Sequence, residues 1–93
     1  MGRLAELKKR VPITVLLKHY GWSGWEEHSR AKEWNRLKCP FHDDRNPSAS
    51  VKRETNRFNC FTCGVRGDII DIVMQVEGFR TVRDAADWIE QRF

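Results

Sequence analysis

The sequence lacks the features that would place it in a membrane, a secretory pathway or a disulfide-bonded fold. It has only three cysteines in 93 residues, and it has no apolar run long enough to span a bilayer. The N-terminal stretch has the pattern of neither a secretory signal nor a transit peptide. Because reduced cysteines are typical of the cytosol, we expect a cytoplasmic protein with no membrane partner.

The chain is also too short to bury a large hydrophobic core. A domain of 93 residues buries little apolar surface, and domains of this size often depend on a metal or on disulfides for stability. Residues 1–93 are therefore interpreted as a single domain that needs a cross-link.

Two short motifs supply a candidate cross-link. The segments C-P-F-H at residues 39–42 and C-F-T-C at residues 60–63 share one spacing, and 17 residues separate them. A two-residue spacer lets one turn direct two side chains at the same ion, and zinc prefers four thiolate or imidazole ligands in a tetrahedron. Four protein ligands leave no position for water, which indicates one structural zinc. The predicted ligands are Cys39, His42, Cys60 and Cys63.

The alternatives for these residues are less specific. The three cysteines could be buried core residues beside an unrelated histidine, and His19 could be a ligand from a predicted helix end. Because the two motifs contain every cysteine, no further thiol remains for a disulfide framework or a nucleophile. Matched spacing in both motifs favours the zinc site.

Charge is distributed unevenly along the chain. Residues 1–66 contain fourteen Lys and Arg against seven Asp and Glu, whereas residues 67–93 contain three against six. A basic front half is typical of a protein that binds a polyanion with one face, although an ordinary solvated surface would have the same composition.

Further motifs surround the four ligands. R-N-P-S follows the first motif at residues 45–48, and C-F-T-C-G is followed by G-D-I-I-D-I from Gly67. This succession resembles the zinc-binding domain of DnaG-type DNA primases of bacteria and phages. Asn46, Ala49 and Thr62 depart from that pattern, in which threonine, an aromatic residue and glycine are usual. The departure at Ala49 argues against a DNA contact through a ring there.

Hydrophobic spacing predicts a helical opening over residues 3–20, with Pro12 at a position where a helix can start. Residues 22–32 are interpreted as a loop or a first hairpin. Alternating residues predict a sheet over about residues 33–64.

Two more helices are predicted after the sheet, over residues 68–77 and 82–92, with Asp68 and Thr81 as N-caps. The fold class is therefore α+β: a small antiparallel, zinc-ribbon-like sheet with one structural zinc, flanked by short helices at both termini.

Alternation also assigns the two faces of the predicted sheet. If Leu37, Val51 and Phe58 face inward, the opposite face combines aromatic rings with cations, which is how single-stranded nucleic acid is commonly bound. The alternative is that the rings cover the metal site or the helices. The predicted DNA-binding residues are Trp34, Arg36, Lys38, Lys52, Arg57, Asn59 and Phe61.

The resemblance to primases implies a function in DNA replication. Such a domain recognises a single-stranded DNA template and assists RNA primer synthesis by a separate RNA-polymerase domain, with the replicative helicase as a further candidate partner in the primosome. The sequence shows no nucleophile, general base or open metal position, so we expect the module itself to be non-catalytic, with DNA primase as the parent activity.

Three other interpretations use the same residues. A zinc-ribbon interaction module could bind the helicase or the polymerase domain without touching DNA. A redox switch could form a disulfide between Cys60 and Cys63 when zinc is lost. Asp68, Asp71 and Glu77 could bind magnesium, but helix caps and a solvated helix face explain these carboxylates more simply.

Overall fold

The computed structural model describes residues 2–22, 24, 33–43 and 47–93. The prediction for residues 22–32 therefore lies almost wholly outside the described residues, as does the departure at Asn46. The described chain measures 34 × 27 × 18 Å along its principal axes. Within these ranges no helix combines the length and the apolar character needed to cross a membrane.

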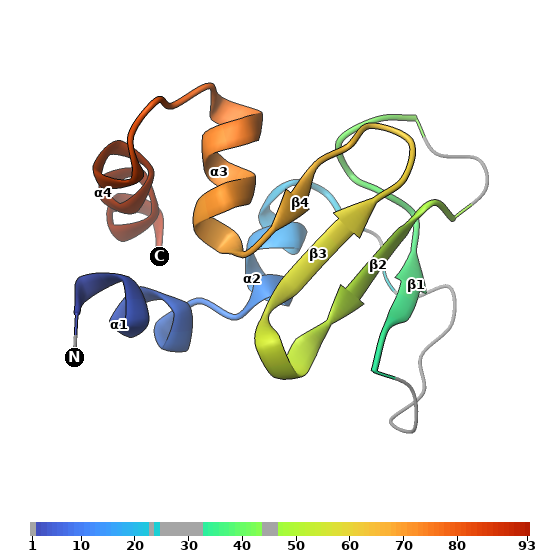
Figure 1. The fold of residues 1–93 in the computed structure, drawn as a ribbon, viewed down its shortest axis with the longest axis horizontal. Coiled ribbons are helices and arrows are strands. Elements are labelled where there is room, and N and C mark those ends of the chain that lie inside the picture. The colour runs from blue at the N-terminus through green and yellow to red at the C-terminus, as the bar shows by residue number, and fades with distance from the viewer. Residues whose placement is uncertain (1, 23, 25–32, 44–46) are drawn as a thin grey trace.

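Helices lie at both ends of the described chain and strands lie between them, as the predicted fold class requires (Figure 1). The elements are α1 (Arg3–Arg10), α2 (Ile13–His19), β1 (Asn35–Leu37), β2 (Ala49–Lys52), η1 (Arg53–Thr55), β3 (Arg57–Cys60), β4 (Arg66–Gly67), α3 (Ile69–Glu77) and α4 (Val82–Arg92). The sheet has the order β1-β2-β3-β4, and each strand is antiparallel to its neighbour.

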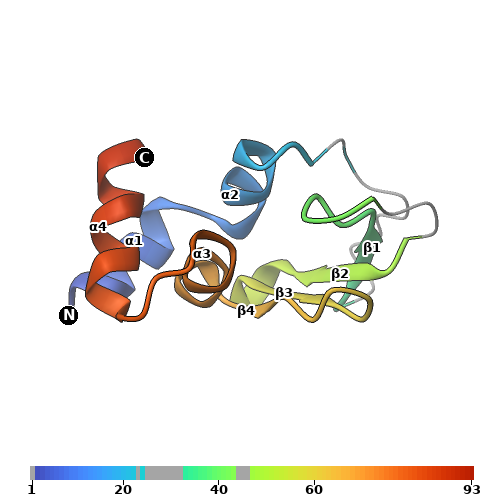
Figure 2. The ribbon, with the colours of Figure 1, turned by 90° about the horizontal axis from the view of Figure 1, so that it is seen from above.

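The helices cover one face and one end of the sheet. Figures 1 and 2 together show α2 against one face, α3 beside β4, and α1 and α4 beyond α3. The other face of the sheet is turned toward the viewer in Figure 1, and no described helix covers it.

The inward-facing strand residues are those that alternation predicts. Leu37, Val51 and Phe58 are at most 1% exposed and belong to one core with residues of all four described helices. Val51 of β2 lies opposite Phe58 of β3, so the strands meet with their apolar sides aligned. The predicted inward face of the sheet is confirmed.

The helical opening is attached to the sheet by Asn56. This residue ends the turn between β2 and β3 in a left-handed conformation, with φ +52°. Its side-chain Oδ1 accepts a hydrogen bond from the backbone N–H of Ile13 at 3.3 Å, and its Nδ2 donates to the backbone carbonyl of Lys8 at 3.2 Å. One side chain therefore satisfies a backbone group at the end of α1 and another at the start of α2.

The third helix begins at a reciprocal cap. The Asp68 carboxylate accepts from the Asp71 N–H and the Asp71 carboxylate accepts from the Asp68 N–H, each at 3.0 Å. Glu77 at the other end of α3 accepts a hydrogen bond from the Tyr20 hydroxyl at 2.9 Å. These contacts give all three acidic residues structural partners, which supports the simpler explanation over a magnesium site.

Two details of the C-terminal half differ from the sequence-based expectations. Strand β4 lies beyond the predicted sheet, because a two-residue strand is too short to show alternation. The spacing of hydrophobic residues in the sequence groups Val82 with Ala85, Ala86 and Ile89 on one side of α4, but Val82 is 42% exposed, whereas the other three are buried.

Candidate metal centre and nucleic-acid interface

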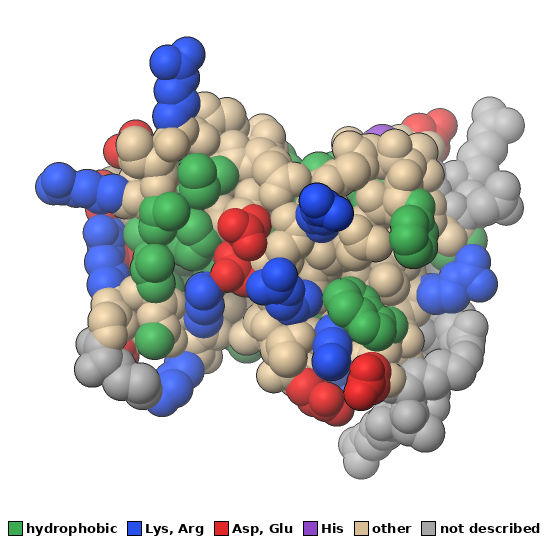
Figure 3. Space-filling model, in the orientation of Figure 1, with side chains coloured by type: hydrophobic (Ala, Val, Ile, Leu, Met, Phe, Trp, Pro, Cys, Tyr) green, Lys and Arg blue, Asp and Glu red, His purple; other side chains and the backbone are tan. Residues whose placement is uncertain are grey.

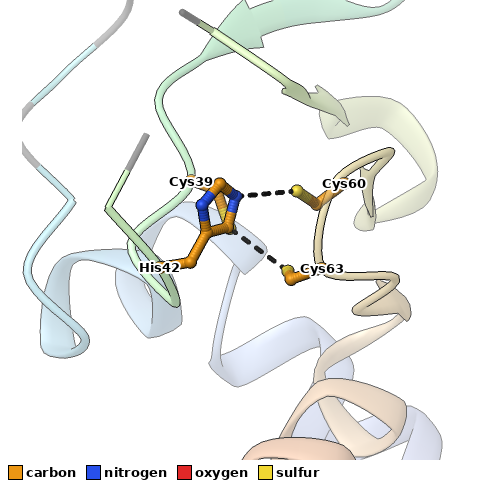
Figure 4. Close-up of side chains that lie close together, drawn as sticks. All are labelled: Cys39, His42, Cys60 and Cys63. Atoms are coloured by element: carbon orange, nitrogen blue, oxygen red, sulfur yellow. Dashed lines mark hydrogen bonds between the residues drawn. The ribbon is translucent and has the colours of Figure 1, made fainter. Parts of the chain in front are cut away.

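The four predicted ligands converge between two turns. Cys39 and His42 follow β1, and Cys60 and Cys63 bracket the turn that leaves β3. Figure 4 shows the four side chains pointing toward a common centre. Their ligand atoms all lie within 4.8 Å of one another. The strands therefore bring together two motifs that are distant in sequence.

The distances between ligand atoms fit one zinc ion. The Sγ atoms of Cys39 and Cys63 are 3.7 Å apart, and Nε2 of His42 is 3.3 Å from Sγ of Cys60. Tetrahedral zinc, with bonds of about 2.3 Å to sulfur and about 2.0 Å to nitrogen, holds its ligand atoms roughly 3.5 Å apart. When bound, the ion would join the turn after β1 to the turn after β3.

The orientation of the His42 ring is set by the backbone. Its Nδ1 lies 3.2 Å from the carbonyl oxygen of Asp43. A proton on Nδ1 donates to that carbonyl, which leaves the lone pair of Nε2 directed at the cysteines, as a metal ligand requires.

Ser48 supports the same two ligands. Its Oγ lies 3.3 Å from Sγ of Cys60 and 3.4 Å from Nε2 of His42. Ser48 ends the R-N-P-S motif, so this motif contributes to the surroundings of the metal centre.

The thiols differ in their tendency to ionise. Burial alone would raise the pKa of Cys60, but hydrogen bonds from the Cys63 backbone and from Ser48 outweigh it and lower the pKa to about 6. Burial instead raises the pKa of Cys39. Since zinc binds thiolates, metal binding must remove the proton from Cys39, and the affinity for zinc falls as the pH falls.

Phe41 anchors the first metal-binding turn in the core. Its ring packs edge-on against Phe58, with centroids 5.5 Å apart, and against Tyr20 at 5.1 Å. The turn is thereby joined to both β3 and the end of α2, so ligand positions depend on core packing.

The structure also bears on the alternative ligand and on the redox interpretation. His19 is exposed and packs edge-on against Tyr20, Trp88 and Phe93, apart from the four ligands. The sulfur atoms of Cys39 and Cys63 are in direct contact. The pair that the redox interpretation joins, Cys60 and Cys63, belongs to the same four-residue cluster.

The uncovered side of the sheet is called the outer face. Figure 3 shows Lys and Arg side chains interspersed with hydrophobic ones on this side of the molecule, over the strands. It is formed by the strand residues that alternate with the core residues, by Trp34 just before β1 and by Phe61 just after β3. The outer face consists of Trp34, Arg36, Ser50, Lys52, Arg57, Asn59, Phe61 and Arg66.

A hollow of about 520 Å³ lies on the outer face. Four of the predicted DNA-binding residues line it, namely Trp34, Arg57, Asn59 and Phe61. The Phe61 side chain is 84% exposed and Trp34 is 41% exposed. The ring of Phe61 therefore does not cover the metal centre or the helices.

The other three predicted residues lie outside the lining of the hollow. Arg36 of β1 donates a hydrogen bond to the carbonyl of Pro47 at 3.2 Å. Lys52 lies opposite Arg57 and approaches the Glu33 carboxylate at 3.6 Å. Lys38 follows β1 and is exposed.

Sequence reasoning did not identify Ser50 and Arg66, which also line the hollow. Ser50 alternates with Val51, so strand periodicity could have placed it on the outer face. Arg66 carried no such signal, because β4 was not predicted. Ala49 is 2% exposed and faces the core, so its departure from the family pattern does not alter the outer face.

Comparisons with known proteins agree with this geometry. The CHC2 zinc finger family matches residues 2–92. The gene 58 protein of Mycobacterium phage D29 is 42% identical over 65 residues, which cover 70% of this chain and 50% of that protein. The DNA primase of Mycoplasma genitalium is 34% identical over 85 residues, which cover 91% of this chain and 12% of that protein.

A solved structure has the same fold. The crystal structure of the Aquifex aeolicus primase, comprising its zinc binding and RNA polymerase domains, superposes with a TM-score of 0.71 at 30% identity. The similarity covers 100% of this chain and 22% of the Aquifex chain. The chain thus spans half or less of the length of these relatives. With its Cys-His-Cys-Cys cluster and its small antiparallel sheet, the chain belongs to the CHC2 zinc finger family, the zinc-binding domain of DnaG-type DNA primases.

Proposed function

We propose that this domain recognises the single-stranded DNA template during RNA primer synthesis in DNA replication. The domain binds and positions the template, and an RNA-polymerase domain joins the ribonucleotides. Relatives that bear the name DNA primase support this proposal, as does the Aquifex structure, whose zinc binding and RNA polymerase domains share one chain.

The arrangement of charge on the outer face carries the proposal. Lys52 and Arg57 lie directly opposite each other on β2 and β3, and like charges in such a pair destabilise a sheet. Among the described residues the guanidinium of Arg57 has no acidic partner. Lys52 already approaches the Glu33 carboxylate, so a phosphate backbone bound over these strands would mainly neutralise Arg57 and relieve its repulsion with Lys52, which favours binding of a polyanion to the outer face.

The rings on the outer face favour single strands over duplex. Phe61 and Trp34 line the same hollow, and both are exposed. Unpaired bases stack on such rings with about 1–3 kcal/mol per base, whereas bases inside a duplex are not available for stacking. Asn59 and Ser50 lie between the cations and supply hydrogen-bonding groups for base edges.

The metal centre contributes rigidity in this proposal. Phe61 lies between Cys60 and Cys63, so zinc would fix the turn that presents the most exposed ring of the outer face. Template binding should therefore require the metal even though no DNA group contacts it.

The partners follow from the same proposal. An RNA-polymerase domain, in the same chain or in a separate one, would receive the template, and a replicative helicase would complete a primosome in the cytoplasm. The polymerase partner is supported by the composition of the Aquifex structure, and the helicase by resemblance to primases alone.

A binding experiment tests the proposal. Zinc-loaded protein is titrated with a mixed-sequence single-stranded oligonucleotide and with the corresponding duplex over a series of salt concentrations. We expect tighter binding of the single strand. Arg57→Ala should reduce the slope of log K against log salt by about 0.7, and Phe61→Ala should weaken binding without changing that slope.

Arg83→Ala is the matched control, because Arg83 is exposed on α4, away from the sheet. Variants of Arg57 and Phe61 that bind as the unmodified protein does would contradict the proposal. If such variants also supported normal primer synthesis with a polymerase domain, the interaction-module interpretation would replace it.

A further inference from the structure

The side-chain amide of Gln75 forms hydrogen bonds with both backbone groups of Arg66, its N–H and its carbonyl. Gln75 lies on the exposed side of α3, and its Nε2 donates to the carbonyl oxygen of Arg66 at 2.7 Å and to that of Asp71 at 2.9 Å. The backbone N–H of Arg66 donates in return to Oε1 of Gln75 at 3.3 Å. A helix side chain therefore takes the place of a neighbouring strand.

The register of β4 explains why these backbone groups need a partner. The N–H of Cys60 donates to the carbonyl of Val65, which makes Cys60 and Val65 a hydrogen-bonded pair. The next pair, Asn59 and Arg66, is then non-hydrogen-bonded, and its backbone groups point away from the strand opposite. Because β4 is an edge strand, Gln75 occupies the positions that a further strand would otherwise use.

This arrangement positions the Arg66 side chain on the outer face. Arg66 lines the hollow that contains Trp34 and Phe61, and it also lines a smaller hollow of about 420 Å³ with Cys60 and Gly64. Arg66 is exposed, and among the described residues its guanidinium has no acidic partner. A positive charge is thus held beside the turn that carries two of the metal ligands.

Arg66 also completes a row that crosses the sheet. Arg36 lies opposite Ser50, Ser50 opposite Asn59, and Asn59 opposite Arg66. Three inter-strand spacings of about 4.8 Å give the row a length of about 14 Å, enough to contact more than one nucleotide of a single strand. Cations stand at its two ends, and the hydroxyl and amide groups lie between them.

We propose that Arg66 binds a template phosphate at the β4 end of this row, and that Gln75 is the positioning residue that fixes it there. The inference rests on the proposed function, since it names the residues that would bind the same single strand. Without Gln75, the two-residue strand β4 loses the hydrogen bonds along its outer edge. The backbone of Arg66 would then be mobile, and its side chain would not be held at one position on the outer face.

The test is a double-mutant cycle on zinc-loaded protein with the single-stranded oligonucleotide as probe. Arg66→Ala should lower the affinity about fivefold at low salt, the size of a good exposed ion pair, and should reduce the salt slope by about 0.7. Arg66→Lys should retain most of the slope. Gln75→Ala should shift affinity and slope toward those of Arg66→Ala, although it removes no charge.

The combined variant separates positioning from general stability. Gln75→Ala in the Arg66→Ala background should cause no further loss beyond about twofold, because the two residues act through one contact. Gln91→Ala on α4 is the matched control and should bind as the unmodified protein does. Gln75→Met keeps the length of the side chain without its hydrogen bonds, and it should behave as Gln75→Ala does. Zinc content and the unfolding midpoint are measured for every variant.

Each outcome decides the inference. Equal losses from Gln75→Ala with and without the Arg66 side chain would overturn the positioning role. Normal binding by Arg66→Ala, combined with weakened binding by Arg57→Ala, would overturn this inference and leave the proposed function standing. Absence of salt-dependent single-strand binding by the unmodified protein would overturn both.

Discussion

The backbone of Gly67 lies directly against the carboxylate of Asp71, so no side chain can be accommodated at position 67. A Cβ on Gly67 would collide with Cβ, Cγ and Oδ2 of Asp71, and the φ of Gly67 is +118°, where L-residues are strained. Asp71 cannot easily move, because its carboxylate accepts a hydrogen bond from the N–H of Asp68. The glycine thus allows β4 to lead directly into the cap of α3.

The first prediction follows from this contact. Gly67→Ala should lower the free energy of unfolding by more than about 2 kcal/mol, because backbone strain and the collision with Asp71 add to each other. Gly78→Ala is the control, since Gly78 has φ +75° but open space around the position of a Cβ. It should cost only about 1 kcal/mol. If urea unfolding showed equal losses in the free energy of unfolding for the two variants, the contact with Asp71 would not contribute to the effect.

The second prediction concerns the metal. Purified protein should contain one zinc per chain, and Cys60→Ser should lose both the ion and the cooperative unfolding transition. Zinc binding contributes about 10–16 kcal/mol in small zinc-finger peptides, which is comparable with the entire stability of a domain of this size. Thr62→Ala, an exposed change in the same turn, should keep the metal. Retention of stoichiometric zinc by Cys60→Ser would contradict the assignment.

The third prediction concerns the attachment of the helices by Asn56. Asn56→Ala removes the hydrogen bonds to Ile13 and Lys8 and places alanine at φ +52°. We expect a loss of about 2–4 kcal/mol in the free energy of unfolding. Asn56→Gly relieves the backbone strain but not the lost hydrogen bonds, so it should be intermediate. If the glycine variant is as stable as the unmodified protein, the side chain does not hold the helices.

The fourth prediction concerns ionisation of Tyr20, the one tyrosine in the sequence. Burial raises the pKa of its hydroxyl, and the hydrogen bond to Glu77 raises it further, to well above its usual range. Because the pKa is higher in the folded state, the protonated Tyr20 hydroxyl stabilises the fold. This stabilisation is complete below the unfolded-chain pKa of about 10 and is lost as the pH rises through the folded-state pKa.

Tyrosinate absorbance measures this shift directly, because a single residue titrates. The absorbance of the folded protein should rise at clearly higher pH than that of the protein in denaturant. Glu77→Gln should lower the folded-state pKa in part, since burial of Tyr20 remains. Coincident titration curves for the folded and unfolded protein would show that Tyr20 is freely solvated.

The metal ligands and the core face of the sheet could be predicted because their signals are local and periodic. Two motifs of equal spacing identified the cluster, and alternation placed Leu37, Val51 and Phe58 in the core. The cap of α3 could be predicted in part from the sequence, since Asp68 and Asp71 have the spacing of a reciprocal cap.

The features that could not be predicted depend on contacts between distant segments. Nothing near Asn56 in the sequence indicates that its amide satisfies backbone groups of α1 and α2. The two-residue strand that carries Arg66 exists because β3 pairs with one of its sides and Gln75 with the other. Charge pattern alone could not separate Arg66 from the other surface cations.

The central claim is that single-stranded DNA binds the outer face of the sheet, and mapping the bound strand tests it most directly. Backbone amide shifts of the zinc-loaded, isotope-labelled protein are followed while a single-stranded oligonucleotide is added at low salt. We predict that the largest changes occur at Ser50, Asn59, Phe61 and Arg66, with little change on α1 and α4. Changes confined to the helices, with the strand amides unaffected, would contradict the account.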